Sequence, residues 1–205
     1  MKILALSPHT DDCEIGCGGS IAKHSGNGHE IYHVAFSKAV KSIPDGFSSD
    51  STEREVRQAS DILGATNLQI YNFPVRDFPA YRQEILEIMT QINNEFSPDL
   101  VLLPSTFDTH QDHQVVTAEG FRAFKYCSIL GYEIPWNNLK FVTSSFVLLS
   151  NAHLRKKIQA VEAYMSQKIK MYGGTTCIET LAAFRGNQIH SRYAEAFEVI
   201  RWIIK

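Results

Sequence analysis

Short apolar runs alternate with longer amphipathic stretches along the first two thirds of the chain. Strands are predicted where apolar residues are nearly continuous, at 3–6, 30–36, 68–71, 99–103 and 141–149. Helices are predicted where apolar residues recur every three or four positions, at 16–26, 51–63, 81–96 and 151–165. The pattern at 194–204 predicts a terminal helix or a helix–strand mixture. As a whole, the alternation predicts βαβ units and an α/β fold with a mostly parallel sheet.

The composition is that of an ordinary globular protein. The chain has 205 residues, of which 44% are hydrophobic and 20% charged, so we expect a single domain over residues 1–205. The formal net charge of −2 provides no overall attraction to nucleic acid or to an anionic membrane, and neither is expected as a partner. No apolar run reaches the roughly 18 to 20 residues of a membrane span.

Cysteine usage and the amino terminus predict a cytoplasmic location. The cysteines contain no C-x-x-C pair and are too few for a disulfide scaffold, which favours a reducing compartment; they are Cys13, Cys17, Cys127 and Cys177. The apolar run at 3–6 is followed closely by Pro8 and His9, so it is too short for the core of a signal peptide.

His and Asp residues cluster directly after two of the predicted strands. The two clusters are His9, Asp11 and Asp12 after the first strand, and His110, Asp112 and His113 after the strand at 99–103. Ligands bind at the carboxyl ends of strands in an open α/β sheet, so both clusters are expected on one rim. His9 and Asp12 are three residues apart, as are His110 and His113, which lets each pair face one point on a helical turn. This pattern is typical of a metal site.

Two histidines and one carboxylate form the candidate ligand set. His9, Asp12 and His113 would leave one coordination position open for water, as at catalytic zinc sites, and non-haem iron would fit the same triad. Asp11 is the candidate general base for that water. His110 is the candidate partner of a developing oxyanion.

Asp112 is expected to hold the second nitrogen of an imidazole and so to fix its tautomer. Each of these residues alone also has a structural explanation, because Asp at a strand end is often a helix cap. Two independent clusters at adjacent strand ends favour the metal site over that explanation.

The glycines after the first cluster partly resemble a nucleotide-binding motif. Gly16, Gly18 and Gly19 lack the third glycine of a dinucleotide fingerprint, because Ile21 occupies its place, and the acids before them would repel a pyrophosphate. We therefore predict that these glycines allow close packing of helix and strand. Cys13 and Cys17 are predicted to be buried packing residues.

Both clusters resemble the motifs of a known enzyme family. The segments PHTDDCE at 8–14 and GCGG at 16–19 are similar to the opening motif of the LmbE-like, or PIG-L, zinc-dependent deacetylases. The segment DTHQDH at 108–113 resembles the second motif of that family. Further likeness at 55–64, 185–186 and 193–197 extends the resemblance over nearly the whole chain. Thr10 replaces the usual proline, and Cys13 separates Asp12 from Glu14.

The resemblance implies both a fold and an activity. The family has a Rossmann-like, three-layer αβα fold and removes acetyl groups from N-acetylglucosamine units of small glycosides, thiol precursors, glycolipids or antibiotics. By resemblance, His9, Asp12 and His113 bind one zinc ion per chain, Asp11 is the base and His110 stabilises the oxyanion. We therefore expect a zinc-dependent amide hydrolase that removes the N-acetyl group of a small sugar or glycoconjugate.

Substrate choice is expected to reside in loop-rich segments that follow the catalytic strands, at 125–136 and 173–192. Candidate contacts to sugar hydroxyls or to an anionic aglycone are Arg54, Arg76, His190 and Arg192. The resemblance also implies that a neighbour's loop can close the site near His190, and the chain is compatible with a monomer or a closed homo-oligomer. Residues 38–50 are expected to form a mobile loop.

Two alternative functions stay open from the sequence. A metal-dependent hydrolase of another amide or ester would keep the same triad and Asp11. A non-catalytic carbohydrate- or nucleotide-binding module on a Rossmann-like scaffold would need neither of them, since a fold alone does not determine function.

Overall fold

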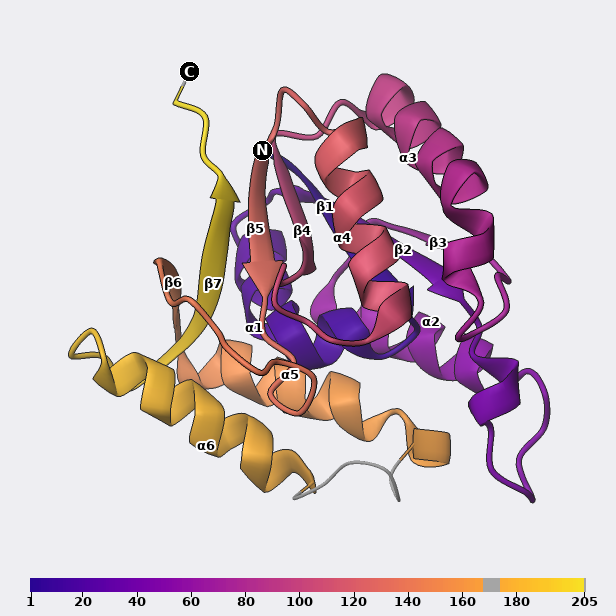
Figure 1. Ribbon diagram of the computed structural model, residues 1–205. Helices are drawn as coiled ribbons and strands as arrows, with labels where there is room; N and C mark the ends of the chain where they lie inside the picture. The colour runs from indigo at the N-terminus through magenta and orange to yellow at the C-terminus, as the bar shows by residue number, and fades with distance from the viewer. Residues whose placement is uncertain (168–173, 205) are drawn as a thin grey trace.

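A seven-stranded sheet organises the described part of the chain, residues 1–167 and 174–204 of a computed structural model (Figure 1). The strand order is β3-β2-β1-β4-β5-β7-β6. Strands β1 to β5 are parallel to one another, and β7 runs antiparallel between β5 and β6. The strands are β1 Lys2–His9, β2 Glu30–Ser37, β3 Asn67–Ile70, β4 Leu100–Pro104, β5 Ser128–Tyr132, β6 Ser145–Leu149 and β7 Tyr193–Arg201.

Helices cover both faces of this sheet. They are α1 Asp12–Gly26, α2 Ser51–Leu63, α3 Arg82–Phe96, α4 Gln111–Ala123, α5 Asn151–Glu162 and α6 Gly174–Asn187, with short 3-10 helices at Val40–Ser42, Phe78–Tyr81 and Met165–Gln167. Along β1, Ile3 and Ala5 pack in the core beneath α1, α2, α5 and α6, whereas Leu4 and Leu6 pack beneath α3 and α4 (Figure 1). Because successive strand residues point to opposite faces, the predicted αβα layering is confirmed.

The structure corrects several predicted elements in the first half. Helix α1 begins at Asp12 rather than near Gly16, so Asp12 lies on the helix's opening turn and Asp11 directly before it. The predicted mobile loop at 38–50 contains a 3-10 helix at Val40–Ser42. Helix α4 was not predicted, because polar residues occupy its first turn. An apolar stripe, which would identify a helix, is therefore absent from that turn.

The second half departs further from the predicted elements. The loop-rich segment at 125–136 contains β5, a five-residue strand too short to show a period. Within 173–192, residue 173 lies outside the described residues, and α6 occupies Gly174–Asn187; its threonines and leading glycine weaken the helical signal. The terminal stretch is a strand, β7, whose first five residues are all buried and therefore show no alternation.

Close contact between α1 and the sheet requires glycine at position 16. A Cβ atom there would lie 2.3 Å from Cδ2 of Tyr132, whose hydroxyl donates a hydrogen bond to the Leu6 carbonyl at 2.9 Å. At Gly19, a Cβ atom would lie 2.5 Å from Leu149 Cδ1. The prediction that these glycines serve helix–strand packing is therefore confirmed for Gly16 and Gly19, whereas Gly18 faces Lys157 of α5 and Leu63 of α2.

The sheet changes winding direction between β1 and β4. Strand β1 is followed by α1 on one face, and β4 is followed by α4 on the opposite face. In doubly wound sheets, this switch point opens a crevice beyond the carboxyl ends of the two strands. The fold therefore places both polar clusters at one crevice.

Candidate metal centre

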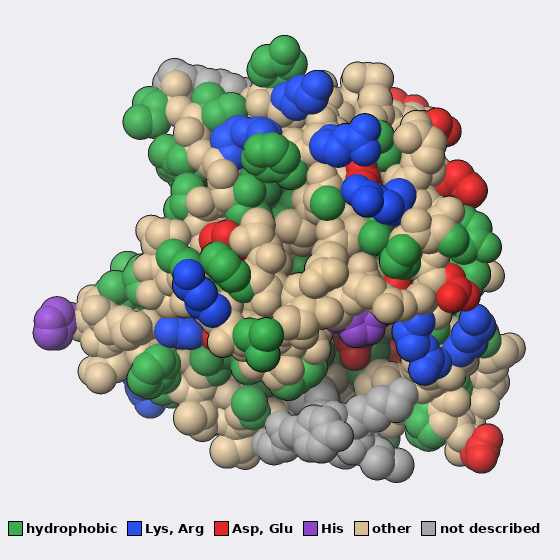
Figure 2. Space-filling view, viewed as in Figure 1, with side chains coloured by type: hydrophobic (Ala, Val, Ile, Leu, Met, Phe, Trp, Pro, Cys, Tyr) green, Lys and Arg blue, Asp and Glu red, His purple; other side chains and the backbone are tan. Residues whose placement is uncertain are grey.

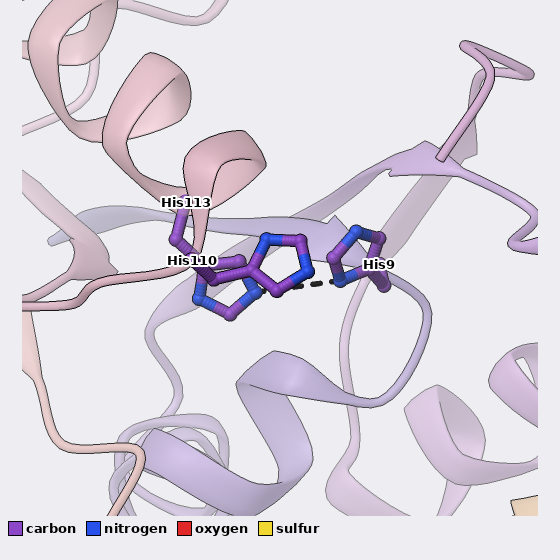
Figure 3. A group of neighbouring side chains, drawn as sticks. All are labelled: His9, His110 and His113. Atoms are coloured by element: carbon purple, nitrogen blue, oxygen red, sulfur yellow. Dashed lines mark hydrogen bonds between the residues drawn. The ribbon is translucent and has the colours of Figure 1, made fainter. Parts of the chain in front are cut away.

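The two polar clusters meet beyond the ends of β1 and β4. His9 is the last residue of β1, Asp12 is the first residue of α1, and His113 lies in the first turn of α4. His110 is the cap of α4. Figure 3 shows the imidazoles of His9, His110 and His113 turned toward one another. One nitrogen from each lies within 4.8 Å of the others.

Three donor atoms form a nearly equilateral triangle. Nδ1 of His9 lies 3.3 Å from Oδ2 of Asp12, and Nε2 of His113 lies 3.3 Å from the same oxygen. The two nitrogens are 3.3 Å apart, and a dashed line joins them in Figure 3. Tetrahedral ligands held about 2.0–2.1 Å from zinc are roughly 3.3–3.4 Å from each other. The residues present therefore fit a zinc ion, and two histidines with one carboxylate also fit iron. We call His9, Asp12 and His113, with the residues that orient them, the metal corner.

A second carboxylate orients each of the two candidate ligand imidazoles, His9 and His113. Nε2 of His9 lies 2.9 Å from Oδ2 of Asp112, and Nδ1 of His113 lies 2.7 Å from Oδ2 of Asp108. With these nitrogens donating, Nδ1 of His9 and Nε2 of His113 keep free lone pairs for a cation. Asp112 thus lies where an orienting residue is expected, and Asp108 is an orienting residue that sequence reasoning did not single out.

His110 is held differently from the two candidate ligand histidines, His9 and His113. The backbone N–H of Asp112 donates to its Nδ1 at 3.2 Å, so Nε2 carries the proton of the neutral ring. Burial, together with the charges of His113 and His9, lowers the pKa of His110. A neutral imidazole that donates from Nε2 is suited to a developing oxyanion.

The metal corner attracts positive charge. Burial opposes the charged imidazoles, but Asp12 with Asp112 raises the pKa of His9 to about 9, and Asp12 with Asp108 raises the pKa of His113 to about 10. Burial also opposes ionisation of Asp12, yet the two histidines hold its pKa well below the usual range. Acidic groups around two imidazoles provide the electrostatic setting that a divalent cation requires.

Asp11 stands beside the candidate metal ligands. It precedes α1 and lines the same cavity as His9 and His110. Burial and the neighbouring Asp12 charge raise the pKa of Asp11 to about 6. A carboxylate with this pKa accepts and returns a proton near neutral pH, although a cation beside it would lower the value.

The cavity over the metal corner separates the predicted substrate residues into two groups. Arg76 lines it, whereas Arg54, His190 and Arg192 do not; their part in substrate binding stays a prediction. Of the segment at 125–136, only Trp136 reaches the lining. Sequence reasoning missed the lining residues Lys41 and Gln167. Figure 2 shows histidine and acidic side chains on the floor of a hollow with basic side chains beside it.

Two comparisons of sequence agree with this geometry. A family model described as PIG-L, GlcNAc-PI de-N-acetylase, matches residues 4–124, a range that contains every residue of the metal corner. The diacetylchitobiose deacetylase of Thermococcus kodakarensis is 28% identical over 172 residues, which cover 82% of this chain. The match spans only 61% of that relative's length.

Solved structures share the fold over nearly the whole chain. The N,N'-diacetylchitobiose deacetylase of Pyrococcus horikoshii matches with a TM-score of 0.82 and 21% identity over 97% of this chain and 83% of that one. The 4-carboxy-2-hydroxymuconate hydratase GalB of Pseudomonas putida KT2440 also reaches 0.82, with 19% identity over 100% of this chain and 98% of that one. One fold therefore carries different chemistry, and the activity must be argued from the site.

Proposed function

This chain belongs to the PIG-L family of GlcNAc-PI de-N-acetylases, and from that premise we propose that it is a zinc-dependent hydrolase that removes the N-acetyl group from an N-acetylglucosamine-type sugar or glycoconjugate. The observation that carries the proposal is the triangle of His9 Nδ1, Asp12 Oδ2 and His113 Nε2, with edges of 3.3 Å. These three atoms would hold the metal.

The metal, when bound, supplies a Lewis acid that polarises water and the acetamide carbonyl. Asp11 takes the proton of the attacking water as its oxygen bonds to the carbonyl carbon. His110 donates from Nε2 to the oxyanion that forms. The carbon–nitrogen bond then breaks, Asp11 returns its proton to the departing nitrogen, and acetate and a free amine result.

The similarity to diacetylchitobiose deacetylases supports an acetamido sugar as substrate. Asp11 beside the metal corner favours turnover over a carbohydrate-binding module without activity, because binding alone needs no base. A hydrolase of another amide or ester would use the same groups. Activity on acetamido sugars must therefore be compared with activity on other amides and esters. Among residues 1–167 and 174–204, no helix combines the length and hydropathy needed to cross a membrane.

The first experiment measures metal content and amine release on the same preparation. Protein purified without an affinity-metal step should contain about one zinc per chain by elemental mass spectrometry. It should release amine from N,N'-diacetylchitobiose, lose that activity with a chelator and regain it with zinc. Equal turnover of simple esters and unrelated amides, without preference for acetamido sugars, would favour the other hydrolase.

His24→Ala is a matched control for the ligand variants. His24 stacks on His29 with ring centroids 5.2 Å apart and does not line the cavity. It should keep both zinc and activity. If neither zinc nor iron binds after reconstitution, and no acetamido sugar is cleaved, the proposed function is wrong.

A further inference from the structure

The cavity above the metal corner is larger than an acetamide group requires. Its volume is about 480 Å³, within the approximate range of 300–1,000 Å³ for pockets that enclose a small molecule. Trp136, 47% exposed, adds an indole ring to the lining. The cavity therefore has room for a sugar ring and for a further substituent.

Charge is distributed unevenly around this cavity. Among its described lining residues, the only carboxylates are Asp11 and Asp12, both at the metal corner. Lys41 and Arg76 also line the cavity, and we call these two residues the basic rim. A substrate that fills the cavity would bring its acetamide to the acidic side and another part of itself to the basic rim.

Arg76 is the stronger cation of the two for a ligand. Within residues 1–167 and 174–204, no carboxylate forms an ion pair with its exposed guanidinium. Lys41 Nζ lies 3.2 Å from Asp77 Oδ2, and both side chains are at least half exposed, so water weakens that pair. The planar guanidinium of Arg76 can form two parallel hydrogen bonds to a phosphate or carboxylate.

The backbone of Arg76 is held in a conformation that arginine rarely adopts. Its φ is +72°, in the left-handed region where glycine would fit at lower energy. The N–H of Arg76 donates to Asp112 Oδ2 at 2.6 Å, and its carbonyl accepts from Gln111 Nε2. Strained residues fixed by their surroundings cluster at functional sites. An arginine kept here, lining the cavity and unpaired with any carboxylate among residues 1–167 and 174–204, indicates that its side chain has a use.

From the lining, the free guanidinium and the pinned backbone, we propose that Arg76, assisted by Lys41, forms a subsite for an anionic group, a phosphate or a carboxylate, attached to the acetamido sugar. This inference rests on the proposed function and specifies its substrate class. Arg76 is then a residue that determines specificity, whereas the metal corner performs the hydrolysis.

The test compares neutral and anionic acetamido sugars on the zinc-loaded protein. The substrates are methyl N-acetylglucosaminide, N-acetylglucosamine 1-phosphate and the carboxylate-bearing N-acetylmuramic acid. At low ionic strength, at least one anionic sugar should exceed the neutral one about tenfold in kcat/KM, and added salt should reduce the difference. The better of the two anionic sugars identifies phosphate or carboxylate as the preferred group.

Arg76→Gln should lower the ratio of anionic to neutral kcat/KM about tenfold, mainly through KM, because a charge-assisted hydrogen bond is lost. Arg76→Lys, which keeps the charge but not the planar fork, should lower the ratio less. Arg57→Gln is the matched control: this exposed arginine pairs with Glu53 at 2.8 Å and does not line the cavity, so the ratio should not change.

Equal kcat/KM for neutral and anionic sugars, with no change of their ratio in Arg76→Gln, would overturn the subsite and leave the proposed deacetylase intact. Calorimetric binding of glucosamine 1-phosphate gives a readout that needs no turnover. If no acetamido sugar is cleaved, the proposed function fails, and weaker binding to Arg76→Gln than to Arg57→Gln would still support the anion subsite. Equal binding to both variants would refute it.

Discussion

In the metal corner, the imidazoles of His9 and His113 are each fixed from two sides, whereas on the basic rim the side chains of Lys41 and Arg76 are exposed. His9 and His113 each place one nitrogen toward the centre and the other on a carboxylate. On the rim, the backbone of Arg76 is fixed through Asp112 and Gln111, and Lys41 forms one exposed pair with Asp77. One side of the cavity thus holds the atoms proposed to react in fixed positions. The other side fixes only the backbone that carries the adaptable side chain of Arg76.

This difference has a physical reason. A metal site tolerates little displacement, because its ligands must meet one ion at fixed distances, so burial and orienting carboxylates are required. Recognition of a charged substituent tolerates more displacement, since a long side chain in water can follow its ligand. We expect substitutions in the metal corner to affect zinc and turnover strongly, and substitutions on the rim to change substrate preference by smaller factors.

The largest effect is expected from His113→Gln. Loss of the Nε2 donor opens the ligand triangle, so zinc should fall from about one per chain to near zero at micromolar metal, and activity should vanish. Elemental mass spectrometry and amine release check this, with circular dichroism to verify that the variant is folded. Normal zinc stoichiometry and affinity would remove His113 from the ligand set.

Asp11→Asn should separate chemistry from metal binding. The amide cannot take a proton from water, so kcat should fall by roughly 10² or more, within the range for a positioned general base, while zinc content stays near normal. Steady-state kinetics and metal analysis of one preparation provide both values. Full activity would show that Asp11 is not the base.

Asp108→Asn tests the orienting carboxylates. The asparagine keeps the shape but weakens the hydrogen bond from His113 Nδ1, so zinc affinity should fall about 10- to 100-fold without complete loss of the site. Competition against a chelator of known affinity measures this change. An unchanged affinity would mean that the 2.7 Å contact contributes only to packing.

Asp77→Asn should produce the smallest effect and acts only on the rim. Removal of the partner of Lys41 leaves that ammonium more available to a substrate anion, so the preference for an anionic acetamido sugar should rise about twofold. The free energy of unfolding should change by less than about 0.5 kcal/mol, since the pair is exposed. A loss of zinc in this variant would contradict the separation of the two sides.

The sequence was sufficient to predict features whose residues lie close together along the chain. The clusters around His9 and His113 stand directly after apolar runs, so strand ends and short spacings were enough to bring them together. Asp108 was not singled out, because its contact with His113 depends on how the loop before α4 turns, and no periodic pattern reports that turn.

The spacing of residues in the sequence could not predict that Lys41 and Arg76 line the same cavity, for a similar reason. Lys41 follows β2 and Arg76 follows β3, and only the assembled sheet shows that their side chains line one cavity. The rest of the fold was missed where the signal was weak: β5 is short, α6 is rich in threonine, and the buried start of β7 hides its strand period. The α/β class and the mostly parallel sheet were recognisable because they depend on the strong patterns of the first half, whereas the αβα layering was implied by the family resemblance.

Asp112 constrains how this protein can be redesigned. Its carboxylate accepts from His9 Nε2 and from the Arg76 N–H through Oδ2, and from the Phe78 N–H through Oδ1 at 3.3 Å. Exchange of the whole loop around Arg76 for a foreign sequence would disturb the carboxylate that orients His9, a proposed metal ligand. A library aimed at new substrates should therefore keep this loop's backbone and vary the side chain at position 76 alone, so that substrate range can change while zinc affinity is preserved.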